Sequence, residues 1–374
     1  MTASLKDVAQ RAGVSVRTVS NVVHDAPYVA PATRARVQAA LAELGYRPNL
    51  AARTLRQGRS GLLGLVVPEI DSPYFGELAG LLADAAERRG ATLVVDQTRG
   101  DARRERRLLS GPSGQLVDGL LLSPWALSPA EVAARPAGVP LVLLGERYDG
   151  TDDHVGVDSV AAARTATAHL LATGRRRVAA LGLQPHLANQ TALQRVTGYR
   201  QALQEAGHRP DPRLEVAVQS LHRADGAQGM LALLALADPP DAVFCFTDEL
   251  ALGAMRVAWE RGVRVPDDVA LVGFDDVEDG RWSRPSLTTV SPDKAVLAEV
   301  AVDRLLERVG GEDGPASSTT TPHALVLRES SAVTPPALTP PALATPALTP
   351  PALTPPAGPP RSARAAPARR PRPG

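Results

Sequence analysis

The sequence predicts an α/β protein in which an N-terminal unit of three helices precedes two doubly wound α/β subdomains and a disordered, proline-rich tail. Apolar residues recur at helical spacing in the first unit. Buried-strand patterns then alternate with amphipathic segments, and a TPPAL-type repeat follows. The predicted units are residues 1–46, a hinge helix and linker at 47–60, the two subdomains at 61–331 and the tail at 332–374.

The N-terminal unit contains three short helices joined by tight turns. The first ends at Gly13, a residue suited to a turn, and the second begins after Ser15, a good N-cap. Pro31 starts the third helix, which ends at Gly45. The inward apolar residues are Leu5, Val8, Ala9 and Ala12 in the first helix, Val19, Val22 and Val23 in the second, and Val37, Leu41 and Leu44 in the third.

The second unit begins at Gly61, where short apolar runs alternate with longer helical segments. The runs predict buried parallel strands, and their two series predict two subdomains. A ligand of such a pair binds beyond the carboxyl ends of the strands. The runs are LLGLVVP at 62, TLVVD at 92, DGLLLS at 118 and PLVLLG at 140, then RRVAALG at 176, DAVFCFT at 241 and DVALVGFDD at 268, with helical segments at 158–173, 194–206 and 248–261.

Charge is segregated along the chain. Residues 1–60 carry nine Lys and Arg against three Asp and Glu, and residues 334–374 carry five Arg and no acidic residue. Because the whole chain carries +1, the segment between them carries −10. Basic residues contact phosphates whereas an acidic surface repels DNA, so we expect only the N-terminal unit to face DNA. Solvated Arg-rich helices are the alternative interpretation.

Several protein classes are disfavoured. Cys245 is the only cysteine, which excludes an internal disulfide and a cysteine metal cluster. No export signal and no apolar stretch of about 20 residues is found, so a cytoplasmic location is expected. The motifs HExxH, GxSxG, GxxxxGK[ST] and GxGxxG are absent, so we expect no enzyme activity, catalytic residue or cofactor. A metal site is not expected either, since no metal spacing relates His154, His169, His186, His208 and His222.

The run VSVRTVSNVV, residues 14–23, has the character of a DNA-reading helix. Its inward valines leave Val16, Arg17, Ser20 and Asn21 outward near the helix start. In the major groove, Arg donates two hydrogen bonds to guanine, Asn pairs with adenine, and an aliphatic group contacts the thymine methyl. We assign Ser15, Thr18 and Ser20 to phosphates or capping.

Longer motifs resemble the LacI/GalR family of bacterial regulators over roughly residues 4–330. They are LKDVAQRAGVSVRTVSNVV, ATRARVQAALAELGYRPNLAARTLRQGRS, TDELALGAM and VGFDD. The resemblance implies a helix-turn-helix homodimer that reads a pseudo-palindrome. It also implies a body like periplasmic sugar-binding proteins, controlled by a small ligand.

The segment LAARTLR at 50–56 is a good helix former but spans only about two turns, so it should be mostly unfolded alone. We expect DNA contacts from Asn49, Ala52 and Leu55 when it pairs with its dimer mate in the minor groove. The resemblance places Leu55 as the wedge that opens the central base step. The alternative is an ordinary linker with Leu55 packed on the core.

Candidate effector-binding residues follow the predicted strands. Asp71, Tyr74 and Phe75 follow the first strand, and Asp248 and Asp275 follow two later strands. The resemblance adds Arg195, in the segment QRVTGY, as a bidentate clamp on hydroxyls or a carboxylate. Core packing for the two aromatic residues, and a helix N-cap for Asp248, are the alternatives.

Two positions depart from the commonest family pattern. Thr247 stands where Asn is frequent, and Gly145 and Glu146 stand where a strand-ending Asp is frequent. These departures leave the identity of the effector open: a sugar or sugar phosphate is the default, and a purine or another metabolite is the alternative.

The sequence predicts a sequence-specific transcriptional regulator, most simply a repressor, that binds operator DNA as a dimer and responds to a sugar-like effector. The tail lacks a leucine heptad, which favours a dimer over a tetramer. It is passive or adds weak DNA affinity. A solute-binding protein without regulatory output and a metabolite-dependent global regulator are the alternatives, and either direction of effector response is compatible with the sequence.

Overall fold

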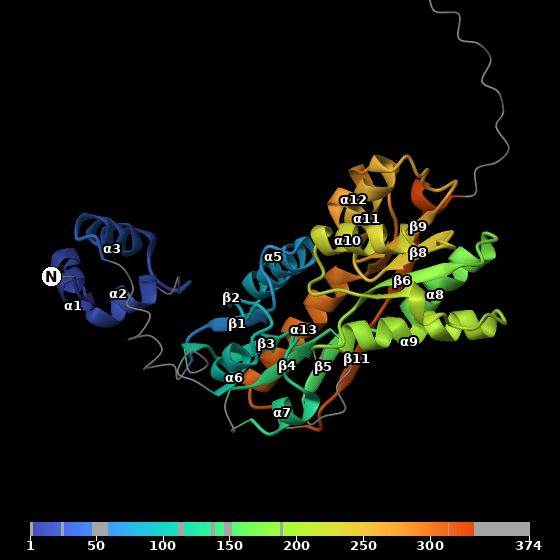
Figure 1. Ribbon diagram of the computed structural model, residues 1–374. Coiled ribbons are helices and arrows are strands. Elements are labelled where there is room, and N and C mark those ends of the chain that lie inside the picture. Colours follow the sequence, from blue (N-terminus) through green and yellow to red (C-terminus); the bar gives the residue numbers. More distant parts are fainter. Residues whose placement is uncertain are drawn as a thin grey trace, which may run out of the picture. The chain divides into compact units, whose positions relative to one another are not determined.

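A computed structural model describes residues 3–23, 26–46, 59–110, 116–135, 139–145, 152–187, 190–312 and 314–332 (Figure 1). The predicted fold class is confirmed: a three-helix unit and two α/β subdomains are present. The predicted hinge contacts Asn49, Ala52 and Leu55, the position Glu146 and the tail lie outside the described residues, so they stay predictions.

The N-terminal unit begins with the expected helices. Ser4 and Asp7 form a capping box at the start of α1, and Gly13 ends that helix with φ of 63°. The Thr18 amide donates to the Ser15 hydroxyl oxygen at 3.1 Å, which starts α2 as predicted. The core of the unit contains Val8, Val19 and Val37 with no exposed surface. The helices are α1 (Leu5–Ala12), α2 (Val16–Val23) and α3 (Pro31–Glu43).

The first subdomain is built on a six-stranded sheet in the order β11-β5-β4-β3-β1-β2, in which every pairing is parallel. The strand order reverses at β1, which lies between β2 and β3. The strands are β1 (Leu62–Val67), β2 (Thr92–Gln97), β3 (Gly119–Leu122), β4 (Leu141–Leu144), β5 (Asp153–Val157) and β11 (Ser318–Thr321).

The second subdomain repeats this arrangement in the order β12-β10-β9-β8-β6-β7. Its edge strand β12 pairs antiparallel with β10, a departure from the predicted all-parallel pattern. The strands are β6 (Val178–Leu183), β7 (Glu215–Ala217), β8 (Ala242–Cys245), β9 (Ala270–Phe274), β10 (Thr288–Pro292) and β12 (His323–Val326).

Helices cover both sheets. Helices α8 and α9 lie side by side, as do α10 and α11, and α5 packs against α13 (Figure 1). The helices are α5 (Pro73–Arg88), α6 (Ala102–Ser110), α7 (Pro129–Ala133), α8 (Ser159–Ala172), α9 (Gln190–Glu205), α10 (Arg223–Leu234), α11 (Asp248–Glu260), α12 (Glu278–Trp282) and α13 (Lys294–Val309), with 3₁₀ turns at Pro212–Leu214 and Glu329–Ser331.

The chain passes between the subdomains three times. The passages follow β5, β10 and β11, because β6, α13 and β12 each belong to the other subdomain from the strand before them. Each subdomain is therefore completed by segments distant in sequence. No helix of the described residues is long and apolar enough to cross a membrane.

Candidate functional site

The outer face of α2 is the candidate nucleic-acid interface. Arg17 is exposed and Val16 is 43% exposed, while Ser20 and Asn21 are half-buried. A hollow beside α2 is lined by Ser15, Thr18, Asn21, Tyr28, Thr33 and Arg36, among others. The face thus presents a guanidinium, an amide and hydroxyl groups, which are the groups that contact phosphates and base edges.

The candidate effector site is a cavity between the two subdomains, of about 860 Å³ with its opening to solvent included. It lies beyond the carboxyl ends of β1, β3, β4, β8 and β9, where the sequence predicted a ligand site. Of the predicted residues, Tyr74, Phe75, Arg195 and Asp275 line the cavity. Asp71 is exposed and Asp248 is buried, and neither is among the lining residues.

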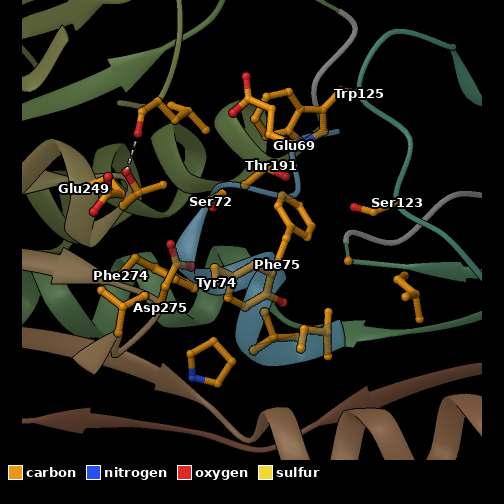
Figure 2. A pocket seen from close by; sticks show the side chains of 18 of the residues that line it. Glu69, Ser72, Tyr74, Phe75, Ser123, Trp125, Thr191, Glu249, Phe274 and Asp275 are labelled. Atoms are coloured by element: carbon orange, nitrogen blue, oxygen red, sulfur yellow. Dashed lines mark hydrogen bonds between the residues drawn. The ribbon is translucent and has the colours of Figure 1, made fainter. Parts of the chain in front are cut away.

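One side of the cavity, here called the aromatic wall, consists of Tyr74, Phe75 and Trp125 (Figure 2). The first two lie in the first turn of α5, and the third follows β3. The Tyr74 and Phe75 ring centroids are 5.1 Å apart, and those of Phe75 and Trp125 are 6.2 Å apart, both edge-to-face. Such a surface can pack against an apolar ligand face.

A second group of lining residues, here called the polar wall, consists of Arg195, Phe274 and Asp275. Arg195 on α9 is 6% exposed and lies with its guanidinium carbon 3.5 Å from the Phe274 ring centroid. Its Nη1 donates to the Phe246 carbonyl, and its Nη2 lies 3.7 Å from Asp275 Oδ1. Within the described residues, its Nε finds no hydrogen-bond partner. A ligand oxygen could accept this bond.

Asp275 is held in an uncommon backbone conformation. Its φ is 113° and that of Asp276 is 50°, values that side chains other than glycine rarely adopt. Lys294 Nζ donates to both carbonyls, at 2.9 and 3.1 Å, and Arg328 Nη2 donates to Asp276 Oδ1 at 2.6 Å. The strained turn directs the Asp275 carboxylate into the cavity (Figure 2).

Asp248 is a buried residue that hydrogen-bonds to the backbone just after this turn. Thr247 is the N-cap of α11, because its hydroxyl accepts from the Leu250 amide, so the alternative interpretation of Asp248 as the N-cap is wrong. Asp248 Oδ2 accepts from the Val277 amide at 2.9 Å and Oδ1 accepts from the Thr289 hydroxyl at 2.6 Å. Burial, and then the nearby Asp275 charge, raise the pKa of Asp248 well above its ordinary value.

Glycine is required next to that carboxyl. A Cβ atom at Gly273 would lie 2.1 Å from Asp248 Oδ1. The VGFDD motif therefore combines the space for a buried carboxyl with the turn that carries Asp275.

Ion pairs lie along the opening of the cavity. His222 Nε2 is 3.2 Å from Glu69 Oε2 and joins the two subdomains there. Glu249 is paired with Arg223 at 2.8 Å. Of the ionisable residues that line the cavity, three are acidic (Glu69, Glu249 and Asp275) and two are basic (Arg195 and His222).

Sequence reasoning missed Trp125, Ser123, Thr191, His222, Glu69, Glu249 and Phe274. Ser123 ends the run DGLLLS, Trp125 lies two residues after it, and Phe274 ends another strand, so a search at strand ends could have found all three. Thr191 and His222 lie on or before helices and carry no local signal. The described residues contain no group of three His, Cys, Asp or Glu side chains that could hold a metal ion.

Two family models match the chain. Residues 4–49 match the bacterial regulatory proteins of the lacI family, and residues 167–331 match a periplasmic binding protein-like domain.

Similar proteins cover most of the chain. The helix-turn-helix-type transcriptional repressor PurR from Mannheimia succiniciproducens is 33% identical to this chain over 332 residues, which cover 88% of this chain and 98% of the relative. A complex of the transcriptional regulator CelR with cellobiose is 32% identical with a TM-score of 0.66 and covers 88% of this chain and 99% of its own. The Lac repressor dimer bound to operator and the anti-inducer ONPF is 29% identical with a TM-score of 0.78, and the match covers 89% of this chain and 100% of the repressor chain.

Proposed function

Since this chain belongs to the lacI family of bacterial regulatory proteins, we propose that the cavity between its subdomains binds an uncharged sugar that controls operator binding by the α2 face. The protein is a DNA-binding transcriptional regulator of the repressor type. The proposal about its effector is carried by one observation, the presence of an aromatic wall and a polar wall in one cavity.

The two walls have the chemistry that a sugar requires. A pyranose ring offers an apolar face to aromatic side chains and hydroxyls to paired donors and acceptors. Asp275 supplies acceptors, Arg195 supplies the unpaired Nε donor, and Trp125 with Phe75 supplies the apolar surface. The complex of the similar regulator CelR with cellobiose supports the same ligand class.

The cavity charges favour a neutral sugar over a sugar phosphate. A phosphate group needs Arg or Lys donors. Arg195 is engaged by Phe246, Phe274 and Asp275, and His222 by Glu69. Because lining carboxylates also outnumber lining basic groups, a dianionic ligand would be repelled.

On the DNA side, we assign Val16, Arg17 and Asn21 to base edges, and Ser15, Thr18 and Ser20 to phosphates or capping. The segment that contains Asn49, Ala52 and Leu55 would occupy the minor groove in a dimer. The similar Lac repressor is likewise a dimer bound to operator. Such a protein acts in the cytoplasm, and its relatives are repressors rather than enzymes.

Effector control would operate through the contacts between the subdomains. A ligand held by both walls favours one relative orientation of the subdomains in proportion to its differential affinity. In a dimer, that orientation sets the spacing of the DNA-reading units and hence operator affinity. Both directions of response use this geometry.

The proposal is tested by selecting bound sequences from random duplex DNA at a stated salt concentration. An enriched pseudo-palindrome is expected, and a panel of neutral sugars, sugar phosphates and purine bases is then screened for changes in its affinity. Response to a neutral sugar supports the effector proposal. Response to phosphates or purines alone overturns it, while no enrichment under any condition overturns the DNA-side assignments.

Arg17→Ala refines the DNA side. It should cost about 1–3 kcal/mol on the selected operator and relax one base position. Arg36→Ala, which removes another arginine beside α2, is the matched control. An equal loss on all sequences would reduce Arg17 to a phosphate contact.

A further inference from the structure

Glu105 is a buried carboxylate that lines neither the effector cavity nor the hollow beside α2. It lies on α6 with no exposed surface, and none of the ion pairs found in the described parts of the chain involves it. A buried carboxylate is costly unless hydrogen bonds replace its lost water. Glu105 meets this requirement entirely with neutral donors.

Those donors come mainly from one loop. The Trp125 amide donates to Glu105 Oε1 at 3.1 Å, and the Leu127 amide donates to Oε2 at 2.9 Å. The Ala126 amide lies between them, at 3.3 and 3.2 Å from the two oxygens. Three consecutive backbone amides are thus gathered on one carboxylate, which fixes the path of residues 125–127.

A fourth donor ties this carboxylate to the sheet. The hydroxyl of Thr98, a residue with no exposed surface, donates to Glu105 Oε1 at 3.3 Å. Thr98 directly follows β2, and its amide donates to the Val67 carbonyl at the end of β1. Glu105 therefore connects the carboxyl ends of β2 and β3, on either side of β1.

The loop carries Trp125 into the effector cavity. Trp125 is 9% exposed and lines the cavity, and its ring lies edge-to-face against Phe75, which follows β1 (Figure 2). No helix or strand contains residues 123–127, so the backbone bonds to Glu105 replace regular structure there.

We propose that Glu105 is a positioning residue of the effector site: its carboxylate holds residues 125–127 so that the Trp125 ring completes the aromatic wall against Phe75. This inference rests on the proposed function only in taking the cavity as the effector site. The side chain does not touch the effector; it acts through the ring it places.

Tryptophan fluorescence tests the proposal without effector or DNA, so its outcome is independent of operator binding. The chain has three tryptophans, of which Trp259 and Trp282 are 71% and 75% exposed. In a full-length Trp259→Phe/Trp282→Phe background, emission and acrylamide quenching report Trp125 alone. Circular dichroism and thermal unfolding establish that each variant is folded at the measuring temperature.

Glu105→Gln replaces one acceptor with an amide that points donors at the loop amides. Its quenching constant should rise about threefold or more, with emission shifted to the red, because the ring leaves its wall. Glu131→Gln is the matched control, since Glu131 accepts from Ser128 and pairs with Arg106, and no hydrogen bond found in the described parts of the chain joins its side chain to residues 125–127. It should leave Trp125 unchanged.

If Glu105 only stabilises the fold and does not position Trp125, a different result is expected. Glu105→Gln then lowers the unfolding temperature but leaves the emission and quenching of Trp125 in the folded protein the same as in the background. That result overturns the proposal. If Glu105→Gln does not fold, Thr98→Val decides, because it removes one donor and leaves the carboxylate. A higher quenching constant in Thr98→Val supports the proposal and an unchanged one overturns it.

Discussion

The two walls of the cavity are built in different ways. The polar wall is held by side chains: Arg195 on Phe274 and Asp275, with buried Asp248 beneath the turn. In the aromatic wall, Tyr74 and Phe75 lie in the first turn of α5, whereas Trp125 lies in a loop whose backbone amides are gathered on Glu105. A side-chain network fixes individual donors and acceptors, whereas a held loop fixes a surface.

This difference indicates how the site divides recognition. Polar groups that must be desolvated discriminate strongly, since an unmatched partner leaves a buried group unpaired. An aromatic surface adds affinity with less discrimination. Substitutions in the polar wall should therefore have larger effects than those in the aromatic wall.

The largest effect is expected for Arg195→Ala. It removes the only cavity-lining guanidinium among the described residues and leaves Asp275 without this partner, so the free energy of unfolding should fall by about 3 kcal/mol. Affinity for the effector found by the operator screen should fall at least about 100-fold. Calorimetric titration and urea unfolding measure the two quantities.

Arg195→Lys is the control for charge. Lysine keeps the charge but lacks the planar fork, so most of the affinity should still be lost. Full retention in Arg195→Lys would show that a point charge suffices.

Asp248→Asn tests the support beneath the polar wall through pH. Because burial raises the pKa of Asp248 in the folded protein, the folded state keeps a proton that the unfolded state releases. The free energy of unfolding of the parent should fall as pH rises from about 4, the unfolded value, to the folded pKa. Over this range, the free energy of unfolding of Asp248→Asn should rise relative to that of the parent by about 1.4 kcal/mol for each unit by which the pKa of Asp248 is raised.

Urea unfolding across that pH range measures this gain. Asp268→Asn is the control with the opposite pH dependence of stability, because hydrogen bonds from Arg264 lower the pKa of exposed Asp268 to about 2. Its contribution to stability is present above the unfolded pKa and is lost as pH falls toward 2. A pH-independent difference for Asp248→Asn would mean that its carboxyl is ionised in the fold.

A smaller effect is expected for Trp125→Ala in the aromatic wall. Loss of one aromatic face should weaken effector binding by about 1–2 kcal/mol, or roughly tenfold. Trp125→Phe keeps a ring and should lose less. A loss larger than that of Arg195→Ala would reverse the proposed ranking of the walls.

The smallest effect is expected for Glu69→Gln at the cavity opening. Glu69 pairs with His222, whose side chain is 40% exposed, and such pairs contribute about 0–1 kcal/mol. Effector affinity should change by less than about fivefold. A larger change would make this pair part of the binding site itself.

The long apolar runs predicted the fold well because they form the central strands. LLGLVVP and DVALVGFDD became β1 and β9, and the three helical segments were found with ends shifted by a few residues. Strands β5, β7, β10, β11 and β12 were missed, because their sequences are short and contain polar residues and so lack an apolar run. Strands β5 and β10 are nevertheless largely buried.

The candidate site was predictable where a residue follows a strand and not where it acts through other residues. Tyr74, Phe75 and Asp275 were found by the strand-end rule, and Arg195 by resemblance. The same rule misplaced Asp248, since its side chain turns into the protein beneath Gly273. Glu105 lies in an Arg-rich helix whose sequence looks fully solvated, and its partners are backbone amides, which leave no trace in the sequence.

The passages between the sheets also set an order of events during synthesis. Strands β11 and β12 close the outer edges of the first and second sheets, yet both come from residues 318–326. Until the ribosome has made these residues, β5 and β10 remain open edges that could pair with other chains. The two subdomains therefore finish folding almost together and late, although most of the first has been synthesised by residue 157.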